Sequence, residues 1–374
     1  MIFLFFSLVV LLIFALANVY IYKRLVRKFI LFRYINTLFA LVLTLLFFAQ
    51  ALFLLLRRDE YLSDEIYSIL ALLYAPTYCF FFLVVMLDTA RLIRFLFYKT
   101  SLQIHMALRV FFEVAILLCG IFLTYASIHN ALRIPEVKNV ELSLDNLDRT
   151  LKIALLSDIH LGKNLHEDFL NGLIAKVNEQ NVDMVLIPGD LIDTNPKNLE
   201  GYISKLDDFH STYGTFYAVG NHEYYQGINE VLNLLRTRTN INILLNETKD
   251  LGFMNIAGLG DLEGLRKGLF APDVARIKAG IDFSKPSIVL AHQPKTALLY
   301  DLSDFDLIVS GHTHGGQIFP FMFLVKLNQG FLHGLYKLGE YTQLYVTSGA
   351  GFWGPSIRSF ADNEIVILNV KSKK

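Results

Sequence analysis

The distribution of hydrophobic residues divides the chain near residue 130. Before that point, four apolar stretches are each long enough to cross a bilayer core of about 30 Å, which takes about 20 helical residues. These stretches are Met1–Tyr22, Ile35–Leu56, Ile66–Leu87 and Met106–Ile128. The first has neither a basic start nor a small-residue cleavage site, so it is expected to be a span and not a signal peptide. The pattern predicts a transmembrane α-helical domain over residues 1–130.

Basic residues beside the spans predict the orientation of this domain. The first connection contains Lys23, Arg24, Arg27, Lys28 and Arg33, and the third contains Arg91, Arg94 and Lys99. The second has only Arg57 and Arg58, diluted by four acidic residues. Because connections rich in Lys and Arg stay in the cytoplasm, we expect a multi-pass protein of the cell membrane whose C-terminal domain is extracytoplasmic.

From residue 131 to residue 374 the pattern is typical of a water-soluble α/β domain. Residues 140–144 alternate like a half-buried strand, and five continuous apolar runs follow that suit strands buried on both faces. These runs are Lys152–Leu156, Met184–Ile187, Thr215–Val219, Ser287–Ala291 and Asp306–Ser310. Between the first two, residues 169–177 have helical spacing, as a parallel β-α-β unit requires.

The composition agrees with this division. Of 374 residues, 54% are hydrophobic and only 18% are charged, whereas soluble domains carry about a quarter charged residues. Basic and acidic residues number 34 each, so no overall positive field favours nucleic acid as a partner. The two cysteines, Cys79 and Cys119, lie inside apolar stretches, which excludes a disulfide framework.

Each of the five apolar runs ends in residues that can bind metals. In chain order they are Asp158 and His160, Asp190, Asn221 and His222, His292, and finally His312 and His314. A single Asp or His at such a place is more often a helix cap or a packed residue. In layered α/β folds, however, ligand sites gather beyond the carboxyl ends of strands, and five consecutive ends with this chemistry indicate one shared site.

So many carboxylate, amide and imidazole groups exceed the three or four protein ligands of a single metal. Two divalent ions about 3.5–4 Å apart, bridged by one carboxylate, would use them all. Oxygen and nitrogen donors without thiolate favour Mn, Fe, Zn or Co over Mg or Ca alone. Such a pair activates water and neutralises an oxyanion, which is what phosphoester hydrolysis needs.

The same residues form five motifs that together resemble the calcineurin-like metallophosphoesterase superfamily. The motifs are Asp-Ile-His at 158–160, Gly-Asp at 189–190, Gly-Asn-His-Glu at 220–223, His292 and Gly-His-Thr-His-Gly-Gly-Gln at 311–317. The last one is similar to the membrane-associated branch of bacterial phosphohydrolases, which includes enzymes acting on lipid-linked or cell-envelope phosphates. The resemblance implies a four-layer α/β/β/α sandwich over residues 131–374, and it does not extend to the spans.

Carried over residue by residue, the resemblance implies a set of site roles. The first metal would be held by Asp158, His160 and His314, and the second by Asn221, His292 and His312, with Asp190 bridging. His222 would serve as general acid or orient the scissile phosphate, while a metal-bridging hydroxide attacks phosphorus. Asp158 is also expected to brace His222.

Other features have two readings each. Asp193 either supports the site or, more commonly for such a residue, caps the next turn, and Asp261 ends a further apolar run that could approach the site. Arg358 either binds a substrate phosphate as a bidentate donor or is a surface residue beside a loop. The apolar stretch Ile318–Leu338 marks a membrane or ligand contact if exposed and is ordinary core if buried.

The sequence therefore predicts a membrane-anchored dinuclear-metal phosphohydrolase that cleaves a phosphoester or pyrophosphate bond. Its expected partners are a phosphorylated substrate, with a lipid-linked one as the specific candidate, and membrane lipids. One alternative is a non-catalytic metal-fold domain that binds or regulates, and the intact ligand set argues against it. Another is a transporter regulated by the domain, but few charged residues lie within the spans, so no ion path is indicated.

Overall fold

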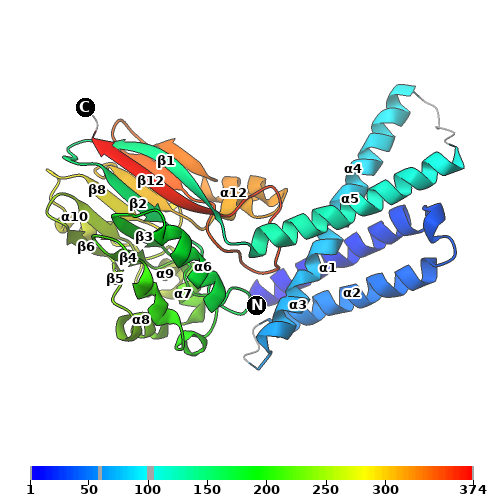
Figure 1. Cartoon of the computed structure of the whole chain (residues 1–374), viewed down its shortest axis with the longest axis horizontal. Coiled ribbons are helices and arrows are strands. Elements are labelled where there is room, and N and C mark those ends of the chain that lie inside the picture. The colour runs from blue at the N-terminus through cyan, green and yellow to red at the C-terminus, as the bar shows by residue number, and fades with distance from the viewer. Residues whose placement is uncertain (1, 58–60, 99–104, 373–374) are drawn as a thin grey trace. The chain divides into compact units, whose positions relative to one another are not determined.

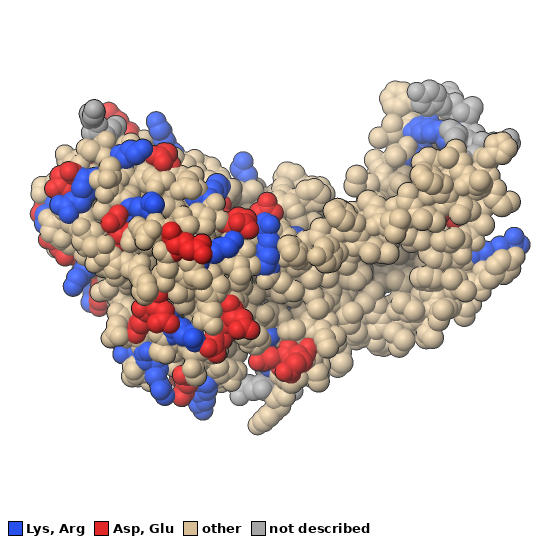
Figure 2. All heavy atoms as spheres, viewed as in Figure 1, with Lys and Arg blue, Asp and Glu red and all other residues tan. Residues whose placement is uncertain are grey.

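The computed structural model describes residues 2–57, 61–98 and 105–372 (Figure 1). The chain divides into two compact units, which we call the helical unit and the α/β unit. The helical unit comprises residues 1–129 and 354–357, and the α/β unit comprises residues 130–353 and 358–374. Acidic and basic side chains are scattered over the visible face of the α/β unit, whereas the visible face of the helical unit is largely uncharged (Figure 2).

Within the described residues, the helical unit contains five α-helices. They are α1 (Ile2–Ile21), α2 (Asn36–Leu56), α3 (Asp64–Leu72), α4 (Tyr74–Tyr98) and α5 (Met106–Leu132). Within the described residues, four stretches are long and apolar enough to span a membrane, namely Ser7–Val26, Asn36–Leu56, Asp64–Phe97 and Met106–Leu132. The four predicted apolar helices are thus confirmed. The third is interrupted at Leu73, because Pro76 in the first turn of α4 has no N–H to continue the ladder from α3.

A buried polar network joins three helices of this unit. The Gln50 amide of α2 donates to the Thr77 hydroxyl of α4 at 2.8 Å, and the Asn18 amide of α1 donates to the Gln50 side-chain oxygen at 3.2 Å. The Thr77 hydroxyl donates in turn to the Asn18 side-chain oxygen at 3.1 Å. Between apolar helices, such closed side-chain networks stabilise association because each polar group finds its partner inside the bundle.

Two six-stranded sheets form the centre of the α/β unit. The first has the order β1 (Glu136–Leu144), β12 (Glu364–Ser372), β2 (Leu151–Leu155), β3 (Met184–Pro188), β4 (Thr215–Ala218) and β5 (Asn242–Ile243). The second has the order β10 (Gly334–Lys337), β11 (Gln343–Val346), β9 (Leu307–Ser310), β8 (Ser287–Leu290), β7 (Asn255–Gly258) and β6 (Glu247–Asp250). Strands β2 to β5 are parallel, and so are β7, β8, β9 and β11.

The two sheets face each other and helices cover their outer faces. Residues such as Leu155, Phe216, Leu290 and Val309 come from both sheets and pack into one core. The outer face of the first sheet is covered by α6 (Glu167–Asn178), α7 (Asn221–Gln226) and α8 (Ile228–Arg238), and that of the second by α10 (Val274–Ala279) and α11 (Thr296–Leu299). The predicted α/β/β/α sandwich is therefore confirmed.

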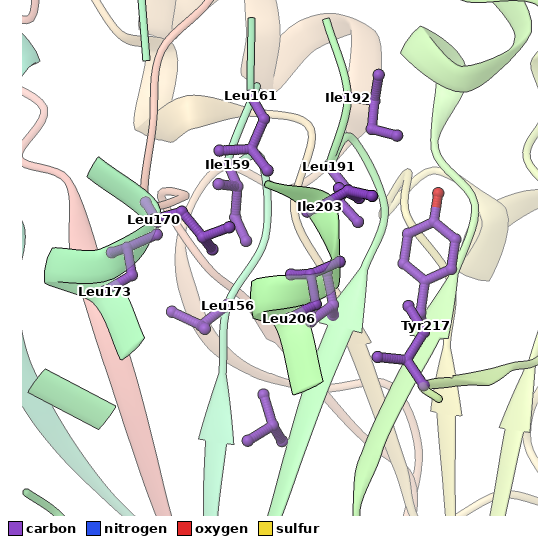
Figure 3. Close-up of a cluster of buried hydrophobic side chains, with 14 of the residues drawn as sticks. Leu156, Ile159, Leu161, Leu170, Leu173, Leu191, Ile192, Ile203, Leu206 and Tyr217 are labelled. Carbon is purple, nitrogen blue, oxygen red and sulfur yellow. The ribbon is translucent and has the colours of Figure 1, made fainter. Parts of the chain in front are cut away.

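Helix α6 illustrates how the sequence builds these layers. Its apolar residues recur at three- and four-residue spacing and are all buried, and its first turn contains acidic residues that favour the helix dipole. Leu170 and Leu173 point from α6 toward Leu156 and Ile159, which continue the line of β2 (Figure 3). This packing holds the segment after β2 in place, and that segment carries the first predicted ligands.

Candidate metal centre

The predicted ligands lie together beyond the carboxyl ends of strands from both sheets. One group consists of Asp158, His160 and His314, and another of Asp190, His292 and His312; within each group, the donor atoms lie within 4.8 Å of one another. Asn221, at the start of α7, belongs with the second group, because its side-chain oxygen lies 3.2 Å from Nε2 of His292. The structure thus brings all seven predicted ligands into one place.

Asp190, a member of the second group, also lies close to the first. Its Oδ2 atom is 3.2 Å from Nε2 of His292 and 3.8 Å from Nε2 of His160. The carboxylate is 2% exposed, and burial alone would raise its pKa, but the positive charges of His292 and His222 outweigh burial and keep the pKa well below the usual range. A permanently charged carboxylate in this position can interact with cations on both sides.

The donor set fits divalent cations. Nε2 of His160 lies 3.1 Å from Nε2 of His314, and burial lowers the pKa of both rings, that of His160 to about 4. Both imidazoles are therefore neutral at pH 7, the state in which they bind metals. The His160 Nδ1 atom is buried and has no hydrogen-bond partner among the described residues. His292 donates from Nδ1 to the Pro188 carbonyl at 2.8 Å, which leaves its Nε2 directed at the site.

The backbone of the predicted ligands is strained. Five of the seven adopt left-handed φ angles, namely Asp158 (54°), His160 (50°), Asp190 (50°), His312 (66°) and His314 (50°). Residues other than glycine rarely adopt this conformation, because it costs of order 1 kcal/mol or more for each residue. Residues in such conformations cluster at functional sites. Gly311 adds a steric constraint, because a Cβ atom there would collide with Ser157 Oγ and Asp158 Oδ2.

Glu223 is a site residue to which the sequence motif assigned no function. Its buried carboxylate accepts N–H groups from Asp190 (3.2 Å), Leu191 (2.8 Å) and Ile192 (3.1 Å) after β3, and from Gly220 (2.7 Å) after β4. The two ligand loops are thereby tied to one side chain. A Glu three residues into a helix after Gly220 forms a capping box, and that signal was present in the sequence.

His222 is held by Asp193, and the expectation that Asp158 braces it is wrong. Nδ1 of His222 lies 2.7 Å from Oδ1 of Asp193, whereas the Asp158 carboxylate accepts the backbone N–H of His312 at 3.0 Å. Of the two readings of Asp193, support of the site is therefore the one that the structure shows. Burial lowers the pKa of His222, but the negative charges of Asp193 and Asp190 outweigh it and raise the pKa to about 10.

Arg358 does not face a substrate. Its side chain is 1% exposed, and it donates to the carbonyl oxygens of Ser348 (2.6 Å), Gly351 (2.8 Å), Ala361 (3.1 Å) and His314 (3.3 Å). Its Nη2 atom also lies 3.1 Å from Nδ1 of His314. The two interpretations of Arg358 from the sequence, a phosphate ligand and a surface residue, are therefore both wrong. The guanidinium instead holds together the loop behind His314.

Asp261 approaches the site indirectly. It follows β7 and is 2% exposed, and its Oδ1 accepts the Gln293 amide at 2.9 Å. Gln293 comes directly after the predicted ligand His292 in the chain. Burial raises the pKa of Asp261 to about 6, and its Oδ2 has no partner among the described residues.

Comparisons with known proteins match the part of the chain that carries the candidate site. A family model described as calcineurin-like phosphoesterase matches residues 151–316. A metallophosphoesterase of Campylobacter jejuni is 66% identical over the full length of both chains, and one of Helicobacter pylori is 46% identical over 71% of each. A Danio rerio protein named as a transmembrane protein with metallophosphoesterase domain is 34% identical over 69% of this chain and 62% of its own.

These matches cover the strand ends at which the seven predicted ligands meet, and the family uses divalent metals on phosphorylated substrates. The chain therefore belongs to the calcineurin-like phosphoesterase family, as a membrane protein with a metal-dependent phosphoesterase domain.

Proposed function

We propose that the protein is a dinuclear-metal phosphohydrolase that cleaves a phosphoester or pyrophosphate bond in a lipid-linked or cell-envelope substrate. The observation that carries the dinuclear proposal is the position of the Asp190 carboxylate, which lies within 4 Å of a histidine from each ligand group. A site for one metal needs no carboxylate shared between two groups of donors.

The donors divide between two cations as follows. Asp158, His160 and His314 would hold the first, Asn221, His292 and His312 would hold the second, and Asp190 would be available to both. The mixed oxygen and nitrogen donors favour Mn, Fe, Zn or Co. Once bound, the cations supply an acidified water as nucleophile and positive charge for the phosphate oxygens.

His222 supplies the proton for the leaving group. Because Nδ1 is engaged by Asp193, the remaining nitrogen, Nε2, is available to the reaction, and it lies 4.0 Å from Oδ2 of Asp190. As the bond between phosphorus and the leaving oxygen breaks, Nε2 donates its proton to that oxygen. The attacking water gives its oxygen to phosphorus and one proton to solvent, and a solvent proton then restores His222.

The substrate proposal rests on the membrane attachment of the chain. The basic connections after the first span and after the third are expected to be cytoplasmic, so we place the site on the extracytoplasmic side of the cell membrane. This orientation can be checked in intact cells with a membrane-impermeant thiol reagent on Lys197→Cys, an exposed position, after Cys79 and Cys119 have been replaced by Ser. Labelling is expected, and labelling only after lysis would reverse the orientation.

The reaction proposal is tested with the full-length protein in detergent. Metals are removed by chelation and restored singly, and turnover of a monoester, a diester, a pyrophosphate and lipid-linked versions is measured beside the metal content. Turnover is expected to return with two metals per chain and to favour the lipid-linked compounds. Asp190→Asn is expected to lose metal and turnover, whereas Asp168→Asn, at an exposed position on α6, keeps both. Full turnover with one metal per chain, or by Asp190→Asn, would refute the proposal.

A further inference from the structure

The apolar stretch after the last metal motif is exposed. In α12 (Phe321–Gln329), the side chains of Phe323 and Leu324 are 63% and 61% exposed, and that of Leu327 is 84% exposed. The exposed apolar set, which we call the α12 patch, consists of Phe319, Phe321, Phe323, Leu324, Leu327 and Phe360. The Phe319 ring contacts the rings of Phe323 and Phe360, at centroid distances of 6.2 and 6.0 Å. The sequence left open whether this stretch is exposed or part of the core, and the structure shows that this part of it is exposed.

Helix α12 is anchored through its other side. A Cβ atom on Gly316, whose φ is 89°, would collide with the backbone of Met322, so the helix packs directly against the last metal motif. At the far end, the buried Gln329 donates to the Gln293 side-chain oxygen at 3.4 Å. A helix of a soluble domain normally turns its apolar stripe inward. In α12 the apolar stripe faces away from the residues that hold the helix.

We propose that the α12 patch docks into the surface of the lipid bilayer in which the chain is anchored. A bilayer is within reach because the same chain contains four membrane-spanning stretches, and only residues 133–135 separate α5 from β1. The composition of α12 also fits this partner: Phe and Leu supply an apolar face that enters the acyl boundary, and the exposed Lys326 can pair with lipid phosphates.

Docking deepens the proposed function by bringing the bilayer surface to the metal centre. The patch begins five residues after the ligand His314, and Gln293, the partner of Gln329, follows the ligand His292. A substrate whose acyl chains stay in the bilayer would thus present its phosphate beside the ligands. This substrate consequence rests on the proposed function, whereas docking itself does not.

Docking is tested by fluorescence quenching in the full-length protein reconstituted into phosphatidylcholine vesicles with brominated acyl chains. The single tryptophan, Trp353, is first replaced by Phe. A new tryptophan is then introduced as Leu327→Trp in the patch, or as Phe283→Trp at a 50% exposed position before β8, at the opposite ends of the strands. We expect brominated lipid to quench Leu327→Trp and to leave Phe283→Trp unchanged. Equal quenching of the two tryptophans would overturn the proposal. An unquenched Leu327→Trp would also overturn it, and this is the result expected if protein covers the patch.

A second experiment measures the consequence for substrate. The double variant Phe323→Ser and Leu327→Ser is compared with the unmodified protein on a two-chain lipid phosphoester in vesicles and on a water-soluble phosphoester. We expect kcat/KM for the lipid substrate to fall about tenfold or more, because the variant no longer buries two large apolar side chains in the bilayer. The soluble substrate should be turned over normally. Normal turnover of the soluble substrate also shows that the variant is folded. An equal effect on both substrates, or none on either, would contradict substrate entry from the bilayer. If neither protein turns over any substrate, the proposed reaction fails, and the quenching result still decides docking.

Discussion

Nδ1 of His222 and Oδ1 of Asp193 lie 2.7 Å apart, although 29 residues separate them in the chain. The carboxylate thereby fixes the orientation of the ring, and it leaves Nε2 for the proposed proton transfer. Gln226 donates to the same oxygen of Asp193 at 3.2 Å, so the carboxylate is itself held in place. His222 and Asp193 should therefore act as a unit.

His222→Ala is expected to keep its metals and to lose turnover by about 10²–10⁴-fold, the usual contribution of a positioned proton donor. Asp193→Asn should lose nearly as much, and the double variant little more than either single one. The measurement is kcat at full metal loading, with a nitrophenyl and an alkyl phosphoester. The loss should be smaller for the nitrophenyl ester, whose leaving group needs no proton. Equal losses for both leaving groups would show that the pair does not deliver a proton.

Glu223→Gln tests the tie between the two ligand loops. In the variant, an amide NH₂ group replaces one of the carboxylate oxygens that accept backbone N–H groups. Donor then faces donor, so the loops after β3 and β4 should separate. Metal affinity is expected to fall by about 10–100-fold, as for other residues that orient ligands. Titration with a metal indicator checks this, with Glu230→Gln on the exposed side of α8 as the matched control. Unchanged affinity in Glu223→Gln would exclude the tie.

Arg358→Met is expected to destabilise the α/β unit. It removes a buried guanidinium and leaves several carbonyls without donors, at about 1–3 kcal/mol for each buried group that stays unpaired. Thermal unfolding of the full-length protein should shift to lower temperature, and metal affinity should fall because the loop behind His314 loosens. Arg238→Met, which removes a half-exposed arginine paired with Glu200, should leave both unchanged. A normal Arg358→Met unfolding profile combined with a raised KM would instead restore Arg358 as a substrate ligand.

Gly311→Ala tests whether the site tolerates a side chain next to the Asp158 carboxylate. The new methyl group would overlap Ser157 and Asp158 side-chain atoms, so the Asp158 carboxylate should move and turnover should fall sharply. Gly339→Ala is the matched control, because nothing lies within 4 Å of its Cβ position. Metal content and kcat of both variants check the prediction. An active Gly311→Ala protein would mean that the Asp158 position tolerates displacement.

The sequence predicted the strands that carry the site better than the rest of the sandwich. The runs at 152–156, 184–187 and 287–291 correspond to β2, β3 and β8, because strands buried on both faces leave a continuous apolar signal. The short strands β5, β6 and β10 leave no such signal. The place of β12 between β1 and β2 could not be predicted either, since it depends on pairing between distant segments.

The sequence could also predict that the candidate ligands come together, because parallel strands of a sheet end at a common edge. The support around them was harder to predict. Arg358 and Glu223 are buried charged residues whose function depends on backbone groups from several loops, and sequence spacing does not encode those contacts. The partner of His222 was misassigned to Asp158 because both Asp158 and Asp193 follow strands that end at the site.

The left-handed backbone at five of the predicted ligands has a consequence for metal selection. Residues held in an unfavourable conformation by their surroundings cannot relax further to suit an incoming ion. The donors then form a cage of nearly fixed shape, and the shape, more than intrinsic affinity, decides which cation is accommodated productively. We expect a cation of the wrong size to bind and yet leave the enzyme inactive, so that the order of metals by occupancy differs from their order by turnover.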